Sequence, residues 1–203
     1  MASKKKTKKK SAKKSTKSAK RSKKKPAKKS AKKRAKNAGA TVTLGGNPVA
    51  VSGKLPAVGK SLPKFSLTTS TLQEVGNKDL AGKRVIFNIF PSIDTPTCAT
   101  STRRFNEIAS TLQNTDVYCV SADLPFAQGR FCGSEGLSNV KTASSFRSGF
   151  GAAFGVNLAS GVLKGVLARA IVVADENGKV LHTELVGEIA SEPNYEAAIN
   201  SLR

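Results

Sequence analysis

One cysteine of this chain stands where a thiol becomes reactive. Cys98 closes the segment 91–98 (PSIDTPTC), which follows an apolar run at 84–90. Thr95 suits the N-cap of a helix and Pro96 its first position, because proline lacks the N–H that this position leaves unused. Cys98 is then the third helical residue, where unpaired backbone N–H groups and the helix dipole favour a thiolate. The alternative is a small buried hydrophobe, as free cysteines often are.

The elements that hold this thiol are predicted by hydrophobic patterning. The segment 84–90 (RVIFNIF) is almost continuously apolar, which is typical of a strand buried on both faces, and Pro91 ends it. After Cys98, apolar residues at positions 105, 108, 109 and 112 recur with helical spacing. The sequence therefore predicts a strand, a short turn and a helix that carries Cys98 in its first turn.

Strand and helix patterns alternate over the rest of the chain, which predicts an α/β layered fold. Segment 180–186 follows the turn 175–178 (DENG) and is expected to be an antiparallel neighbour in the sheet. Gly45-Gly46 reads as the turn of an N-terminal β-hairpin. The other expected elements are strands at 117–122 and 168–174, hairpin strands at 41–44 and 49–51, and helices around 140–154 and from Asn194 onward.

Several segments resemble one enzyme family. Pro91, Thr95 and Cys98 give P-x-x-x-T-x-x-C, which resembles the active-site pattern of the peroxiredoxins, and NIFPSIDTPTC resembles their thiol peroxidase branch. Three further segments are similar to the same branch, and they are 121–137, 163–180 and 192–199. The resemblance implies a thioredoxin-like fold of the peroxiredoxin type in a single domain at 40–203, and a homodimer.

Thr97 departs from the family pattern. The resemblance leads one to expect an apolar residue, usually valine, between Pro96 and the cysteine. We expect this threonine to adjust packing rather than chemistry.

The resemblance implies a two-cysteine peroxidase mechanism. Cys98 would attack a hydroperoxide and become a sulfenic acid, Cys132 would condense with it to a Cys98-Cys132 disulfide, and thioredoxin would restore both thiols. Cys132 stands among glycines at 129, 133 and 136, which predicts a mobile helix end or loop that partly unfolds in each turnover. The alternative is a reduced, structural thiol. No bound cofactor is needed for this chemistry.

Two further side chains have alternative interpretations. Thr95 satisfies a backbone amide if it only caps the helix, whereas in the family pattern its hydroxyl points at the reacting sulfur. Arg169 is a lone cation at the start of an apolar strand, and such arginines usually extend into solvent. By resemblance, Arg169 instead approaches the sulfur and stabilises both the thiolate and the departing oxygen. Pro91 belongs to the same catalytic set by resemblance.

The remaining cysteine and the single histidine suggest no further site. Cys119 lies in an apolar strand without a cap or a basic neighbour, so we expect a buried core residue that takes no part in turnover. His182 lies in an alternating outer strand, and one histidine makes no metal site. Three cysteines, two of them in a reversible cycle, fit a reducing compartment.

The first forty residues differ from the rest in composition. They contain eighteen lysines, two arginines and no acidic residue, which leaves fifteen basic against thirteen acidic residues for the remaining chain. We expect a disordered tail at 1–39, because it has no large apolar side chain after Met1. It has no apolar core of a secretory signal and no segment long enough to cross a membrane, so no membrane partner is expected.

Dense lysine with small spacers predicts binding to nucleic acid through its phosphates, without reading of sequence. The alternatives are an anionic membrane surface, a nuclear import signal in a eukaryotic host, or a solubilising charge run. We expect a cytoplasmic protein, nucleoid-associated through its tail. The expected contact residues are Lys4, Lys5, Lys6, Lys8, Lys9, Lys10, Lys23, Lys24, Lys25, Lys28, Lys29, Lys32, Lys33 and Arg34.

Two hypotheses on function follow from these features. The first is a thiol peroxidase held near nucleic acid by its tail. The second is a nucleic-acid-binding protein that uses the cysteine pair as a redox sensor, with turnover incidental.

Overall fold

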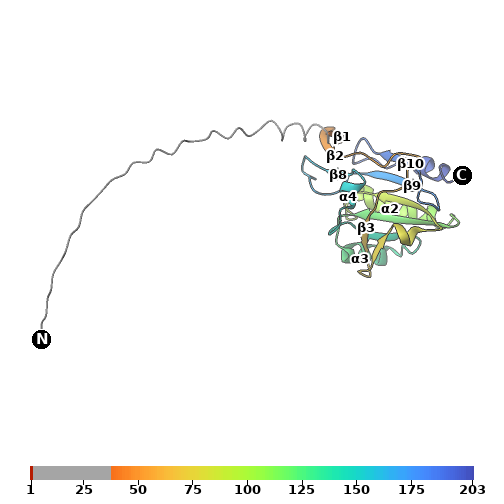
Figure 1. Cartoon of the computed structure of the whole chain (residues 1–203), viewed down its shortest axis with the longest axis horizontal. Helices are drawn as coiled ribbons and strands as arrows, with labels where there is room; N and C mark the ends of the chain where they lie inside the picture. Colours follow the sequence, from red (N-terminus) through yellow and green to blue (C-terminus); the bar gives the residue numbers. More distant parts are fainter. Residues whose placement is uncertain (2–37) are drawn as a thin grey trace, which may run out of the picture.

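The structure is a computed structural model that describes Met1 and residues 38–203 (Figure 1). The predicted basic tail and its lysines therefore lie outside the described residues, apart from Met1 and the last two positions of the predicted range. Strand β1 (Ala38–Leu44) begins at the first residue described after Met1.

A seven-stranded mixed sheet forms the centre of the molecule. Its strands are β3 (Ser66–Thr69), β4 (Glu74–Gly76), β5 (Arg84–Ile89), β6 (Thr115–Ser121), β7 (Lys141–Ser144), β9 (Ala170–Ala174) and β10 (Val180–Leu185). They lie in the order β10-β9-β5-β6-β7-β3-β4. The pairs β5·β6 and β6·β7 are parallel and the others antiparallel. The carboxyl ends of β5 and β6 therefore meet at one edge, where polar side chains can gather.

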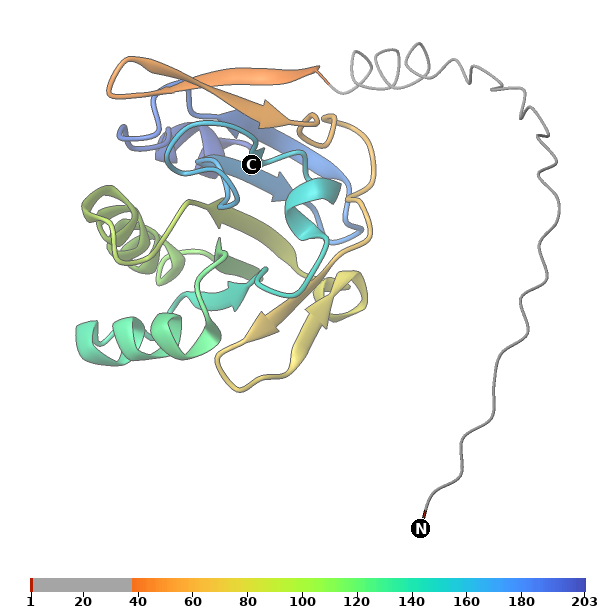
Figure 2. The same ribbon diagram turned by 90° about the vertical axis from the view of Figure 1, so that its left-hand side faces the viewer.

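Helices cover the two faces of this sheet unequally. Figure 2 shows α2 (Pro96–Ala109) and α3 (Pro125–Glu135) on one side of the sheet, and the short α4 (Phe150–Ala153) on the other. On the first side, α5 (Tyr195–Asn200) joins α2 and α3 around a buried cluster that includes Phe105 and Phe131. On the second side, Phe87 packs among aromatic rings from α4 and from the loop before β3, near the 3-10 helix η2 (Asn77–Leu80).

A second, three-stranded sheet adjoins the first. Strands β1 and β2 (Asn47–Ser52) form an antiparallel hairpin, and β8 (Asn157–Leu158) pairs with β2. Gly45 and Gly46 make the turn with φ of 58° and 79°, a conformation that suits glycine. The predicted hairpin is confirmed, as is the antiparallel pairing of β10 with β9.

One sequence expectation is wrong. The helix expected around 140–154 is replaced by strand β7 and the single turn α4, because the open edge of β6 offers parallel partners to residues 141–144. Tertiary pairing here outweighs local pattern. The glycine-containing segment with Cys132, expected as a helix end or loop, is the C-terminal end of helix α3.

Candidate active site

Cys98 lies in the first turn of α2, as predicted, with none of its surface exposed. Thr95 occupies the N-cap position, and its carbonyl accepts the first helical hydrogen bond, from the Ala99 N–H at 2.9 Å. Its hydroxyl caps no backbone amide. The Thr95 Oγ1 lies 2.8 Å from the Cys98 sulfur and 3.1 Å from the Ser92 carbonyl, so it donates to one or the other.

The second group beside this sulfur is Arg169, immediately before β9. Its Nη2 lies 3.4 Å from the Cys98 Sγ, and its Nε donates to the Ile189 carbonyl at 2.9 Å. The side chain is 2% exposed, so it does not extend into solvent. Over residues 38–203, no carboxylate lies within ion-pair distance of this guanidinium. Burial of a charge is costly without a counterion, and the adjacent Cys98 sulfur offers one as a thiolate.

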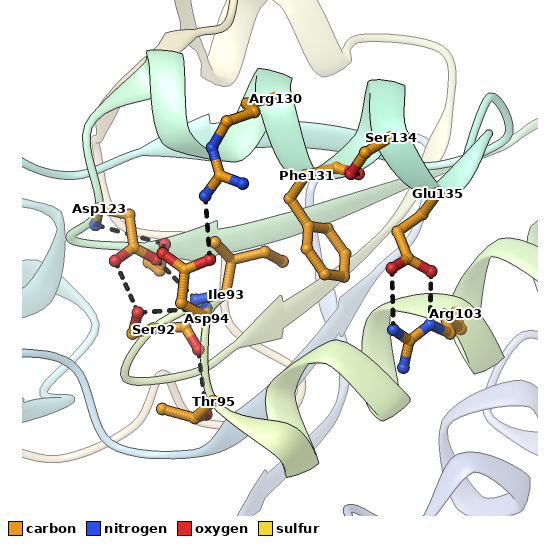
Figure 3. Close-up of polar contacts among 11 residues, drawn as sticks. Ser92, Ile93, Asp94, Thr95, Arg103, Asp123, Arg130, Phe131, Ser134 and Glu135 are labelled. Atoms are coloured by element: carbon orange, nitrogen blue, oxygen red, sulfur yellow. Dashed lines mark hydrogen bonds and ion pairs between the residues drawn. The ribbon is translucent and has the colours of Figure 1, made fainter.

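The loop between β5 and α2 is fixed by a carboxylate from the neighbouring strand end. Pro91 is buried directly after β5. Asp123, just beyond β6, accepts the Ser92 hydroxyl at 2.8 Å, the Ile93 N–H at 2.7 Å and the Ser121 hydroxyl at 2.7 Å (Figure 3). Asp123 also leads into α3, so one residue joins the loop before Cys98 to the start of the helix that carries Cys132.

Cys132 lies half-buried in α3, packed against the apolar cluster on this face of the sheet. Burial raises the pKa of this thiol, because a thiolate is poorly solvated there. The thiol form of Cys132 is therefore favoured at neutral pH. All three cysteines are free in this structure.

Two ion pairs hold the half of α3 that contains Cys132 against α2. Arg103 of α2 makes a bidentate contact with Glu135, with N···O distances of 2.8 and 3.0 Å. Arg130 Nη2 lies 3.3 Å from an Asp94 oxygen just before α2. Figure 3 shows Phe131 pointing toward α2 between these two pairs. All four charged side chains are at least one-third exposed, so water and salt weaken both contacts.

The other half of α3 is anchored differently. Gln128 is fully buried, and its Nε2 donates to the Ser121 hydroxyl at 2.8 Å and to the Ala143 carbonyl at 3.3 Å. Beyond it the helix contains Gly129 and Gly133, and it ends at Gly136 in the left-handed conformation. Glycine inside a helix is destabilising relative to alanine. The segment 129–136 is thus the weaker half of α3.

The other singled-out residues lie where predicted. Cys119 is fully buried in β6, and burial raises its pKa to about 12. His182 lies in β10, at the edge of the main sheet. In residues 38–203, no cluster of three or more His, Cys, Asp or Glu side chains has the arrangement of a metal site, and no helix is long and apolar enough to span a membrane.

Sequence reasoning missed the residues that support the site. Asp123 could have been found from the sequence, because it directly follows the predicted strand 117–122. The neighbouring parallel strand, 84–90, leads to Cys98, and the carboxyl ends of parallel strands meet at one edge of a sheet. The pairs of Arg103 and Arg130 had no such signal, because their partners lie more than thirty residues away. Thr97 does more than adjust packing: its hydroxyl donates to the Ala190 carbonyl at 3.0 Å.

Known proteins resemble this chain over the folded part. Residues 57–199 match the family model described as Redoxin. A thiol peroxidase of Corynebacterium glutamicum is 54% identical over 157 residues, which cover 77% of this chain and 95% of that protein. A thiol peroxidase of Mycobacterium tuberculosis is 55% identical over 163 residues, covering 80% of this chain and 98% of that protein.

Solved structures agree on the fold. A peroxiredoxin-like protein from Aquifex aeolicus superimposes with a TM-score of 0.75 at 43% identity, covering 80% of this chain and 95% of that one. A thiol peroxidase from Chromobacterium violaceum gives a TM-score of 0.74 at 21% identity, with the same coverage, and at that identity the likeness bears on the fold alone.

Proposed function

Because this chain belongs to the thiol peroxidase branch of the peroxiredoxins, within the Redoxin family, we propose that it reduces hydrogen peroxide and organic hydroperoxides through Cys98 and Cys132. The observation that carries this proposal is the buried Arg169 guanidinium, 3.4 Å from the Cys98 sulfur and without a carboxylate partner among the described residues. A buried cation in that position favours a thiolate, which is the reactive form.

In the first step the Cys98 thiolate attacks one oxygen of the peroxide. The S–O bond forms as the O–O bond breaks, so that sulfur is oxidised to a sulfenic acid and the second oxygen leaves as hydroxide or alkoxide, which takes up a proton. Arg169 is suited to stabilise the charge that develops on the leaving oxygen, since its Nη1 has no partner in the described structure. The Thr95 hydroxyl, 2.8 Å from the sulfur, orients the nucleophile or the attacked oxygen.

In the second step the Cys132 thiol condenses with this sulfenic acid. An S–S bond forms and water leaves, and a dithiol such as that of thioredoxin then reduces the disulfide by exchange. Disulfide geometry requires the two Cα atoms to lie within about 7 Å. We infer that segment 129–136 leaves its helical position to meet this requirement, with Gln128 as the anchored end. The exposed ion pairs Arg103–Glu135 and Arg130–Asp94 then act as a latch, which opens in each turnover.

Thioredoxin-coupled peroxide consumption tests this function. The full chain, with thioredoxin, its reductase and hydrogen peroxide, should turn over many times per protein molecule. A protein that is oxidised once and recycled only slowly would favour the alternative, a redox sensor.

We propose that the basic tail binds nucleic acid non-specifically and keeps the enzyme in the cytoplasm near the nucleoid. Its support is the charge of twenty Lys and Arg side chains with no acidic residue. The full chain should retard duplex DNA of any sequence, with log K falling against log salt by about 0.9 per phosphate neutralised. If a third of the tail's cations engage, the slope is roughly −6. If the full chain did not bind DNA at low salt, a nuclear import signal or a solubilising charge run would be the better explanation of the tail.

We also propose a homodimer. Exposed apolar side chains lie at the start of α3 and just after β7, and the largest are Leu124, Phe126 and Phe146. Light scattering on the full chain should give twice the mass of one chain.

A further inference from the structure

One carboxylate joins the N-terminal hairpin to the segment after β10. Glu188 accepts four hydrogen bonds: from the Thr43 hydroxyl at 2.8 Å, and from the N–H groups of Gly45, Gly46 and Ala190 at 3.0, 3.1 and 3.1 Å. Both carboxylate oxygens are used, two donors to each. Backbone contacts reinforce this junction, since Thr43 exchanges hydrogen bonds with Gly187 and Ile189.

The segment after β10, residues 186–190, also contacts two residues of the active-site region, Arg169 and Thr97. The Ile189 carbonyl, next to Glu188, accepts from Arg169 Nε at 2.9 Å, and the Ala190 carbonyl accepts from the Thr97 hydroxyl at 3.0 Å. The Val186 N–H donates to the carbonyl of Arg169 itself at 3.0 Å. Segment 186–190 therefore lies between the hairpin and the guanidinium that contacts Cys98.

We propose that Glu188 is a positioning residue for Arg169: it fixes the turn that presents the Ile189 carbonyl, and this carbonyl aims the guanidinium at Cys98. The proposal rests on the proposed role of Arg169 in peroxide attack. Apart from the sulfur, the Ile189 carbonyl is the only hydrogen-bond acceptor of this side chain among the described residues. A shift in the turn thus moves the guanidinium directly.

The charge of Glu188 is part of this role. Hydrogen bonds, first that of the Thr43 hydroxyl, lower the pKa of Glu188 to about 2, so its carboxylate is ionised at neutral pH. An ionised carboxylate accepts on both oxygens. In Glu188→Gln one oxygen becomes an NH2 group that faces donors, so the amide should not restore the turn.

A double-mutant cycle with Arg169 tests the proposal, because two residues that act through one another are not additive. The measured quantity is the second-order rate of Cys98 oxidation by hydrogen peroxide in single turnover, with the full chain. We expect Glu188→Ala to slow it about tenfold by displacing the guanidinium. Added to Arg169→Met, the same change should have no further effect. The rate of disulfide formation after oxidation should stay unchanged.

Two variants serve as controls. Glu184→Ala removes a carboxylate of β10 that also accepts a backbone N–H, from Asn194 at 2.9 Å, but does not contact segment 186–190. It should oxidise at the wild-type rate. Thr43→Val removes one of the four donors to Glu188 and keeps the shape of the side chain, so it should slow oxidation by about twofold to threefold. If Glu188→Ala does not fold, Thr43→Val replaces it in the double-mutant cycle.

The outcomes separate the two proposals. An unchanged rate in Arg169→Met would remove the catalytic role of Arg169 and the positioning role with it. A slow Arg169→Met beside unchanged Glu188→Ala and Thr43→Val would leave Arg169 in place and overturn the positioning role alone. Equal slowing by Glu188→Ala in both backgrounds would also overturn it, since the effect would then be a general loss of structure.

Discussion

Cys98 and Cys132 lie on neighbouring helices, but among the described residues only Cys98 has polar groups placed around its sulfur that could take part in a reaction. The Cys98 sulfur is fully buried, with the Thr95 hydroxyl at 2.8 Å and the Arg169 guanidinium at 3.4 Å. The Cys132 thiol is half-buried among apolar side chains that raise its pKa, in a helix half that contains glycines and is held by exposed ion pairs.

This difference separates the two steps of the reaction physically. Peroxide attack uses groups that already stand in place, so its rate is set by preorganised electrostatics. In the proposed mechanism, disulfide formation needs segment 129–136 to leave its position, so its rate should be set by the stability of that segment. A change near Cys98 should therefore alter the first rate, and a change in α3 should alter the second.

Removal of either reacting sulfur has the largest expected effect. Cys98→Ser should abolish peroxidase turnover, because no other cysteine among the described residues lies in the first turn of a helix beside a buried guanidinium. Cys132→Ser should still form one sulfenic acid per chain, seen by mass after trapping, but should stall under thioredoxin. Cys119→Ser should be nearly silent, since its hydroxyl oxygen can accept from the Asn88 Nδ2, which lies 3.6 Å from the Cys119 sulfur. Substantial coupled activity in Cys98→Ser would show that the nucleophile is misassigned.

The charge at Arg169 comes next. We expect Arg169→Met to slow Cys98 oxidation about 100-fold, since a charge aimed at the developing oxyanion is lost. Arg169→Lys keeps the charge but lacks the planar fork, so the loss should be smaller, about tenfold. Stopped-flow oxidation at fixed pH measures both. Equal rates in the methionine variant and the wild type would leave Arg169 without a catalytic role.

Weakening the latch, the ion pairs Arg103–Glu135 and Arg130–Asp94, has a smaller expected effect. It should speed disulfide formation, whereas the changes above slow a step. Glu135→Gln removes one exposed ion pair, so disulfide formation should become about twofold to threefold faster while peroxide attack stays unchanged. High salt should act in the same direction on the wild type. Glu74→Gln is the matched control, because it breaks the exposed Arg147–Glu74 pair at the sheet edge, which involves no residue of α3. If Glu135→Gln and Glu74→Gln behaved alike, the latch would have no role.

Removal of residues 1–37 should have the smallest effect on either rate. The side chains that contact the Cys98 sulfur, Thr95 and Arg169, both lie outside this segment, and β1 begins only at Ala38. Both rate constants with small hydroperoxides should stay within experimental error of the full chain, while retardation of DNA should be lost. A shortened chain that retards DNA equally well would contradict the proposed role of the tail.

The sequence predicts those parts of the site whose residues lie close to Cys98 in the chain. The apolar strand at 84–90, Pro91 and the Thr95-Pro96 pair are all within fifteen residues of Cys98, so patterning and capping rules suffice to place the thiol in the first turn of a helix. The use of the Thr95 hydroxyl is different, because two orientations compete: one accepts from a backbone amide, and the other donates to the Ser92 carbonyl or the Cys98 sulfur. Only the folded geometry decides that competition.

The supporting contacts depend on residues far apart in the chain. Glu188 binds residues more than 140 positions earlier, and Arg103 binds Glu135 across two elements. Neither contact has a local periodicity that sequence reasoning could detect. The helix expected around 140–154 failed for the same reason, since strand β7 exists through its pairing with β6. The proposed boundary at residues 39 and 40 stays a prediction.

The most direct test of the two-step account is a single turnover followed at several peroxide concentrations, with rapid alkylation of thiols and mass analysis. The proposed mechanism predicts that loss of the Cys98 thiol accelerates in proportion to peroxide, while the Cys98-Cys132 disulfide appears at a rate that reaches a limit independent of peroxide. Sulfenic acid should accumulate between the two events. Disulfide that appears together with thiol loss at every concentration, with no sulfenic acid detected, would contradict a separate opening step in α3.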